Sequence, residues 1–230
     1  MDRDLFLSVL HRLGFSLTGR RILDVGCGRG FLESVITSQG GWYTGLDVVL
    51  SRSAFRLVMG DAQCLPFRDE AFDLIVCVDA FEHFLQPESA VREFRRVLRP
   101  GGSIFLSVPN YSNIAGLVKW WCEKSGAAPQ YGWAPFGGWQ NQEYEYPMTS
   151  VKLRRLLQTG GFTRGKRLAY AREISIGLFP WVEHPKMPER LRLGIRSMFG
   201  VVGPLLSRIM PWASLHLFWR FDLLHKADHC

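Results

Sequence analysis

The sequence predicts an α/β protein built on a Rossmann-like, doubly wound and mostly parallel sheet of seven strands. Two observations predict this fold class. Apolar, strand-like runs alternate with amphipathic, helix-like segments, and a glycine-rich turn at 26–30 (GCGRG) directly follows the first run. In such sheets, ligands bind beyond the carboxyl ends of the strands, so the residues at those ends are the first candidates for function.

The elements follow from apolar periodicity and from the glycines and prolines between them. The run at 72–78 (FDLIVCV) is almost wholly apolar, as expected for a strand that is covered on both faces. Val91, Phe94 and Leu98 recur at helical spacing. The predicted strands are 21–25, 42–47, 57–60, 72–78, 103–108, 166–172 and 216–224, and the predicted helices are 4–13, 30–38, 87–98 and 150–158.

We expect one domain over residues 1–230 with two insertions. The first insertion is rich in Trp, Tyr, Gly and Pro, and we expect it to form a lid. The second is basic and apolar, with a helical pattern. The core is predicted at about 15–110, 148–173 and 214–226, the lid at about 111–147 and the helical insertion at about 174–213.

Charge and cysteine usage narrow the class of protein. Residues 1–150 hold 14 Lys and Arg against 16 Asp and Glu, whereas residues 151–230 hold 14 against 5. A segment as basic as residues 151–230 often faces phosphate, anionic lipid or an acidic substrate. A solvated basic surface explains the excess of Lys and Arg equally well. The five cysteines contain no CxxC pair, which argues against a disulfide framework or a zinc site and predicts a cytoplasmic protein. We expect no metal, signal peptide or spanning helix.

Acidic residues follow the glycine turn at successive strand ends. Glycines adopt positive φ and let the backbone approach a ligand closely, and the next helix presents unpaired N–H groups. Asp47 ends the second predicted strand, about 20 residues after the turn, where an acid can accept hydrogen bonds from both ribose hydroxyls. Asp61 and Asp79 end the third and fourth strands. Position 31 is Phe, which fits a dinucleotide fingerprint poorly, and no Gly-Lys-Ser/Thr of a P-loop follows.

With these motifs in order, residues 20–110 resemble the class I S-adenosylmethionine-dependent methyltransferases, and most closely their type 11 group of small-molecule enzymes. The stretches that carry the resemblance are ILDVGCGRGFL, GLDV, GDAQCLPF, FDLIVCVDAFEHF and VLRPGGSIFLSVPN. It implies S-adenosyl-L-methionine as cofactor. The residues implied to bind it are Asp24, Gly26, Cys27, Gly28 and Gly30 at the methionine part, Asp47 and Val48 at the ribose and adenine, and Asp61 and Ala62 at the adenine edge. Asp79 and Ala80 are implied to lie beside the cofactor after the fourth strand. The short spacing from Asp47 to Asp61 predicts that the family's second helix is reduced to a turn.

Methyl transfer to a hydroxyl or a carbon requires removal of a proton. His83 is the predicted base because it lies just after the fourth strand and a histidine titrates near neutral pH. The alternative is that His83 only packs on the following helix. Glu82 and Tyr111 are weaker candidates.

The predicted acceptor is a small molecule, apolar, anionic or lipid-linked, methylated at O, N or C. In the lid, Trp120, Trp121, Trp133 and Trp139 offer flat apolar walls, or they merely close the end of the sheet. The stretch at about 188–212 mixes arginines with apolar residues. This pattern is compatible with a peripheral membrane contact, an acceptor site or an ordinary helical hairpin. Alternative functions are an RNA methyltransferase that uses the basic half and a non-catalytic cofactor-binding module. Nucleic acid is disfavoured because DAFEHF stands where such enzymes carry Asn/Asp-Pro-Pro-aromatic. The sequence does not determine the oligomeric state.

Overall fold

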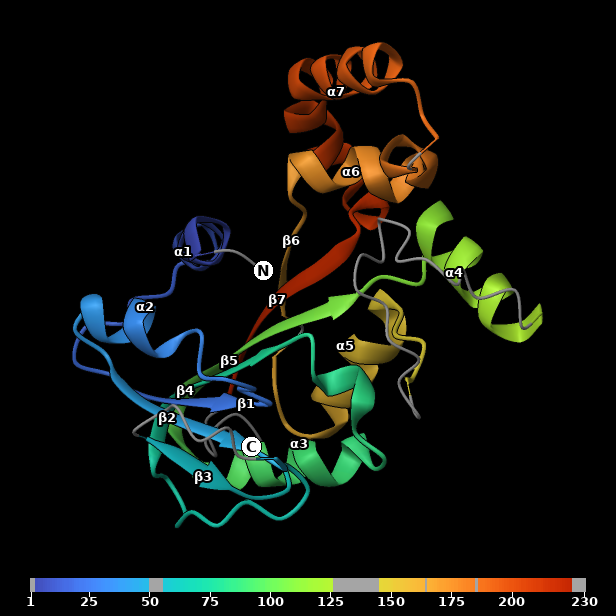
Figure 1. Cartoon of the computed structure of the whole chain (residues 1–230). Helices are drawn as coiled ribbons and strands as arrows, with labels where there is room; N and C mark the ends of the chain where they lie inside the picture. The colour runs from blue at the N-terminus through green and yellow to red at the C-terminus, as the bar shows by residue number, and fades with distance from the viewer. Residues whose placement is uncertain (1–2, 50–55, 126–144, 164, 185, 225–230) are drawn as a thin grey trace. The chain divides into compact units, whose positions relative to one another are not determined.

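The computed structural model describes residues 3–49, 56–125, 145–163, 165–184 and 186–224 (Figure 1). The chain forms two compact units, and both are assembled from separate stretches of sequence. The first unit comprises Met1–Val108, Val151–Lys166 and Phe218–Cys230, and the second comprises Pro109–Ser150 and Arg167–Leu217. The assignment of the whole chain to one domain stays a prediction.

The seven strands form one sheet in the order β3-β2-β1-β4-β5-β7-β6. They are β1 (Arg21–Val25), β2 (Trp42–Asp47), β3 (Leu57–Met59), β4 (Phe72–Val78), β5 (Leu98–Pro109), β6 (Lys166–Leu168) and β7 (His216–Asp222). The pairs from β3 to β5 are parallel. β7 runs antiparallel to β5, because Leu223 N donates to Gly102 O and Asn110 N donates to Leu215 O. The predicted mostly parallel, seven-stranded sheet is confirmed.

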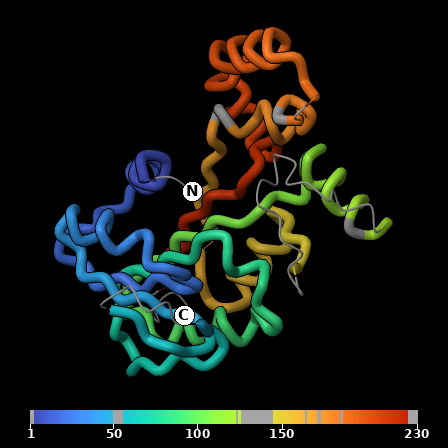
Figure 2. Tube along the Cα trace, viewed as in Figure 1, coloured from blue at the N-terminus to red at the C-terminus, as the bar shows by residue number. Residues whose placement is uncertain are grey.

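The centre of the sheet is apolar on both faces. Six of the seven residues of β4 are buried, and β1 is buried from Ile22 to Val25. β1 and β4 are far apart in the sequence but pair side by side, as the chain trace in Figure 2 also shows. Such continuous burial explains why these two strands carry runs of branched and aliphatic residues rather than an alternating pattern.

Helices cover both faces of the sheet in the first unit, with α2 and α3 on opposite sides (Figure 1). Phe6 of α1 packs edge-on against Phe105 of β5, with ring centroids 5.7 Å apart. On the other side, Gly160 lies so close to Val91 of α3 that a Cβ at this glycine would come within 2.1 Å of the valine methyl. The helices of this unit are α1 (Arg3–Arg12), α2 (Glu33–Ser38), α3 (Pro87–Val97) and α5 (Ser150–Thr159), the last starting at the unit's boundary.

Three element boundaries differ from the sequence prediction by three residues or more. α2 begins at Glu33 rather than at Gly30, because Gly30 has φ +74° and cannot take part in a right-handed helix. β5 begins at Leu98, before the expected turn, because Leu98 pairs with Phe72 ahead of a shift in register. β6 ends at Leu168 because α6 already begins at Ala171.

Most described residues of the second unit outside the strand ends are helical. Its helices are α4 (Ile114–Ser125), α6 (Ala171–Leu178) and α7 (Glu189–Ile209), with short 3-10 turns at Pro180–Glu183 and Pro211–Ala213. The described part of the segment at about 174–213 is therefore largely helical, while its assignment as an insertion stays a prediction. Trp133 and Trp139 of the predicted lid lie outside the described residues, as do residues 50–55 of the stretch between Asp47 and Asp61 where a turn is predicted. Within the described part of the chain, no helix is long and apolar enough to span a membrane.

Candidate cofactor site and the polar networks beside it

The turn after β1 consists of glycines that serve different purposes. Gly26, Gly28 and Gly30 all have positive φ, between +54° and +74°. A Cβ at Gly26 would stand 2.4 Å from the Cβ of Ala80, so this glycine lets the turn pack against the segment after β4. A Cβ at Gly28 would meet nothing within 4 Å. The turn is therefore closed on the side of Gly26 and bare on the side of Gly28, where a ligand can approach the backbone.

Asp24 is a buried carboxyl group at the end of β1, only 2% exposed. Its Oδ2 accepts a 3.0 Å hydrogen bond from the hydroxyl of Tyr43 on β2. Burial raises the pKa of Asp24 to about 7, against the smaller lowering effect of the Tyr43 hydrogen bond. Asp24 is thus a carboxyl group that a neighbouring cation would ionise near neutral pH.

Gly45 makes this arrangement possible. It pairs with Asp24 across the parallel strands, so the two residues face the same side of the sheet. A Cβ at Gly45 would come within 2.7 Å of the Tyr43 hydroxyl oxygen and 2.8 Å of Cys27 Sγ. Burial, with the charges of Asp24 and Asp47, raises the pKa of the Cys27 thiol to about 12. Cys27 therefore stays a neutral thiol that packs under the turn and is not a nucleophile.

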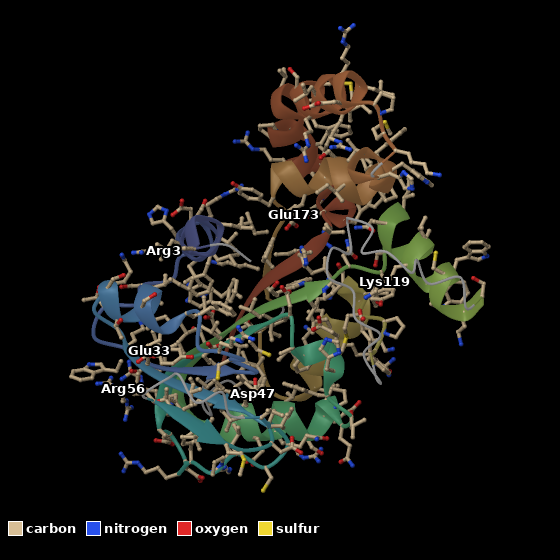
Figure 3. All side chains as sticks on the ribbon, in the orientation of Figure 1. Arg3, Glu33, Asp47, Arg56, Lys119 and Glu173 are labelled. Carbon is tan, nitrogen blue, oxygen red and sulfur yellow. The ribbon has the colours of Figure 1, made fainter. Side chains whose placement is uncertain are left out.

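Asp47 connects the end of β2 to the glycine turn (Figure 3). Its Oδ2 accepts a 2.8 Å hydrogen bond from Gly28 N, and its Oδ1 accepts a 3.1 Å bond from Val49 N. The next side chain, Val48, is exposed. The structure thus brings together the carboxylate predicted to bind a ribose and the bare backbone predicted to approach the cofactor.

Asp61 and Ala62 follow β3, as predicted. Asp61 Oδ1 accepts hydrogen bonds from the backbone N and the side-chain Nε2 of Gln63. Ala62 is buried beneath this turn. The Gln63 side chain in turn accepts a bond from Gln86 N, which ties the turn to the start of α3. Asp61 is therefore held by Gln63, two residues further along the chain, and it is exposed.

Asp79, directly after β4, has φ +49°, which is rare for a residue with a side chain. Two hydrogen bonds with Ser107 of β5 hold it there. Asp79 N donates to Ser107 O at 2.9 Å, and Ser107 Oγ donates to Asp79 Oδ1 at 2.7 Å. Strain of this kind persists where the surrounding structure enforces it, and it concentrates at functional sites.

The two candidates for proton removal after β4 differ in exposure. Glu82 is 1% exposed, whereas about a quarter of the His83 side chain is exposed. His83 Nε2 lies 3.9 Å from Glu82 Oε1. Both belong to the 3-10 turn Phe81–His83, whose Phe81 packs in the core against Phe94 of α3. The structure places both residues in the first unit, with the cofactor-binding candidates.

Tyr111, the third candidate, belongs to the second unit. It is largely buried, and its hydroxyl donates to Glu145 Oε1 at 2.7 Å. Lys119 of α4 forms a buried ion pair with the same carboxylate, and its ammonium group lies 5.1 Å from the centre of the Tyr111 ring. Tyr111 therefore takes part in a buried polar network of the second unit.

The residues of the first unit fit the cofactor that the sequence motifs imply. S-adenosylmethionine carries a sulfonium and an ammonium group, and the ends of β1, β2 and β4 offer carboxyl groups at Asp24, Asp47 and Asp79. The open space at Gly28 leaves the backbone accessible. Low-dielectric surroundings strengthen the attraction between such charges.

Sequence reasoning missed the residues that support these acids. Tyr43, Gly45 and Ser107 read as ordinary strand residues. One signal was available for the first two. Tyr43, Gly45 and Asp47 are spaced two apart, so they share one face of β2, and a glycine inside a strand indicates a close approach at that face.

Comparisons with known proteins find similarity over the part of the chain that holds these residues. Residues 23–106 match the model of a methyltransferase domain family. A curated ubiquinone biosynthesis O-methyltransferase of Idiomarina loihiensis is 32% identical over 162 residues, which cover 62% of this chain and 65% of that protein. The chain spans between half and two thirds of the length of the curated relatives that it matches first.

Solved structures show the same fold at low sequence identity. An S-adenosylmethionine-dependent methyltransferase from Archaeoglobus fulgidus has a TM-score of 0.61 at 18% identity and covers 96% of this chain and 94% of its own. Another, from Mesorhizobium loti, has a TM-score of 0.61 at 16% identity and covers 96% and 100%. These likenesses show the fold that the chain shares with S-adenosylmethionine-dependent methyltransferases.

Proposed function

We propose that this chain, a class I S-adenosylmethionine-dependent methyltransferase by its domain and its fold, methylates an oxygen of a small ring-hydroxylated acceptor with an apolar tail. The single observation that carries the cofactor part of the proposal is the bare turn at Gly28, hydrogen-bonded to Asp47. A sulfonium methyl group needs little activation, so the protein contributes position, removal of water and removal of a proton.

In this proposal the first unit holds the cofactor. Asp24, with the backbone of Gly26 to Gly30 and Cys27, faces the methionine part. Asp47 accepts hydrogen bonds from the ribose hydroxyls, next to Val48. Asp61, Ala62, Asp79 and Ala80 complete the contacts. Support comes from the positive φ angles of the turn and from the hydrogen bond between Asp47 and Gly28.

The acceptor class rests on the relatives and on the second unit. The relatives are named for O-methylation in ubiquinone biosynthesis, which suggests a ring oxygen on an apolar molecule. On α4, Trp120 and Trp121 are 45% and 61% exposed, so they offer apolar surface. We propose that these indoles contact the acceptor, as the predicted lid would require. His83, Glu82 and Tyr111 stay predictions for the removal of its proton.

Calorimetric titration tests the cofactor site. Wild type should bind S-adenosylmethionine and S-adenosylhomocysteine with micromolar affinity, about −8 kcal/mol. Asp47→Ala should weaken both by at least about tenfold, because a charge-assisted hydrogen bond is lost. Asp69→Ala is the matched control, since Asp69 is an exposed acid paired with Arg96. No binding to wild type would refute the proposal, and equal losses in both variants would refute the placement of the site.

Labelled methyl transfer tests the acceptor class. Wild type with labelled S-adenosylmethionine should methylate a prenyl-substituted dihydroxybenzene on oxygen, and the same ring without a prenyl chain should react more slowly. Binding of the cofactor without transfer to either ring would refute the acceptor class while leaving the cofactor site intact.

We further propose that α7 rests on an anionic membrane surface. Apolar side chains recur seven residues apart along this helix, as Leu191, Met198 and Leu205, and they are all more than half exposed. Exposed arginines flank them at positions 190, 196 and 208. An amphipathic, basic helix of this kind lies in the headgroup region, and each basic residue near the surface adds roughly 1 kcal/mol.

Sedimentation with vesicles tests this contact. The chain should bind phosphatidylglycerol vesicles more strongly than phosphatidylcholine vesicles. Met198→Glu combined with Leu205→Glu should abolish the binding, whereas Val151→Glu, at an exposed apolar position of α5, should not. Equal binding of the double variant and the wild type to phosphatidylglycerol vesicles would refute the proposal.

A further inference from the structure

Three polar side chains of the first unit come together beneath the glycine turn. Asp24 lies on β1, Tyr43 lies on the neighbouring β2, and Cys27 belongs to the turn itself. The Tyr43 hydroxyl donates to Asp24 Oδ2 at 3.0 Å. A Cβ at Gly45 would stand 2.7 Å from the Tyr43 hydroxyl oxygen and 2.8 Å from Cys27 Sγ. The glycine therefore leaves just enough room for the hydroxyl and the thiol beside the carboxyl group.

No cation of the described residues compensates a negative charge on Asp24. The residue is 2% exposed, and its hydrogen bond comes from a neutral hydroxyl. In the described part of the chain, no lysine, arginine or histidine forms an ion pair with it. Asp47, a charged neighbour that acts on it, is itself negative. Because a buried charge without a counter-charge is unfavourable, the cluster favours the protonated carboxyl group until a cation arrives.

The groups that surround Asp24 do not titrate in the range where Asp24 does. Burial, with the charges of Asp24 and Asp47, raises the pKa of Cys27 to about 12. Burial also raises the pKa of Tyr43, and that of Cys77 on β4, well above their ordinary values. All three side chains therefore stay neutral between pH 5 and pH 8. Burial raises the pKa of Asp24 to about 7, so Asp24 is the member of this cluster that can exchange a proton near neutral pH.

We propose that the ammonium group of the cofactor displaces the proton of Asp24 as it binds, and that Tyr43 is the residue that positions this carboxyl group. The inference rests on the proposed cofactor site. Asp24 passes its proton to water, and the carboxylate pairs with the ammonium group while it keeps the Tyr43 hydrogen bond. No covalent bond of the cofactor changes. Proton and cofactor then compete for one carboxylate, so cofactor affinity falls as pH drops below 7.

Calorimetric titration in two buffers of different ionisation enthalpy counts the released protons. The ligand is S-adenosylhomocysteine, which carries the ammonium group without the sulfonium charge. An α-amino group is almost fully protonated at pH 6, so protons released at this pH come from the protein. Wild type should release about 0.9 proton per ligand at pH 6 and about half a proton at pH 7. Its affinity should be about 50-fold lower at pH 5 than at pH 7.

Variants and a truncated ligand locate the proton. Asp24→Asn should release no proton at either pH. Tyr43→Phe removes a hydrogen bond that favours the ionised carboxylate, so the pKa of Asp24 should rise further and nearly one proton should still be released at pH 7. Asp69→Asn is the matched control, because Asp69 is an exposed acid paired with Arg96, and it should behave as wild type. 5′-Methylthioadenosine lacks the ammonium group and should release no proton from wild type.

The outcomes separate this inference from the proposed function. If wild type binds S-adenosylhomocysteine at pH 6 without releasing a proton, the inference is wrong and the cofactor site stands. Equal release by wild type and Asp24→Asn would also overturn it, because the proton would then come from another group. Equal release by wild type and Tyr43→Phe at pH 7 would exclude the role of Tyr43. Failure of wild type to bind the ligand at any pH would refute the proposed function and this inference together.

Discussion

Asp24 should make the cofactor-free protein less stable as pH rises. Replacing Asp24 with Asn should remove this pH-dependent loss of the free energy of unfolding. Burial raises the pKa of Asp24 from 3.8 to about 7. Because the folded state binds this proton more tightly than the unfolded state, the stabilisation is complete below about pH 4 and is lost as pH rises towards 7. Three pKa units correspond to about 4 kcal/mol, of which about 2 kcal/mol is lost between pH 5 and pH 7.

Urea unfolding at pH 5 and pH 8 measures this effect. We compare Asp24→Asn with wild type at each pH, and we use Glu88→Gln on the exposed side of α3 as the control. The free energy of unfolding of Asp24→Asn, relative to wild type, should be higher at pH 8 than at pH 5 by up to about 3 kcal/mol. The reasoning would be refuted by a difference that is the same at both pH values, or by one of opposite sign.

Three further variants test the same region and the second unit. Tyr43→Phe removes a bond to the ionised form of Asp24, so calorimetry should show weaker cofactor binding at pH 7 than in wild type and a smaller difference at pH 9. Gly45→Ala places a methyl group against the Tyr43 hydroxyl and should lower the free energy of unfolding by about 1–3 kcal/mol in urea titration. Unchanged stability would contradict that crowding. Lys119→Met leaves the buried Glu145 carboxylate without its cation and should cost about 3–5 kcal/mol, whereas Lys152→Met, on the exposed side of α5, should cost little.

The central elements of the fold could be predicted from the sequence because buried strands are rich in apolar residues. β1, β2 and β4 begin and end at the predicted residues, since each is an apolar run next to glycine or acid. The boundaries that differ depend on backbone conformation. The residues at 30–33 do not reveal that Gly30 adopts a positive φ, so that the helix begins later. The sequence likewise does not reveal that Leu98 pairs with the neighbouring strand ahead of a register shift.

The candidate site divides in the same way. The acids at strand ends and the glycine turn follow from spacing along one segment of chain. The Tyr43–Asp24 bond needs the register of β1 against β2, and the Ser107–Asp79 bond joins residues 28 positions apart. Contacts between such distant residues depend on the packing of the whole unit, which a single sequence does not display.

Two independent structural requirements limit which residue can occupy position 79. Its backbone angle, φ +49°, admits Gly, Asn and Asp far more readily than other residues. The hydroxyl of Ser107 needs an oxygen acceptor on the side chain at that position, which Gly lacks. Only Asp and Asn meet both requirements, so the fold alone restricts this position to two residue types, whatever catalysis requires. A substitution library built at this codon should recover those two residues from folded protein and few others.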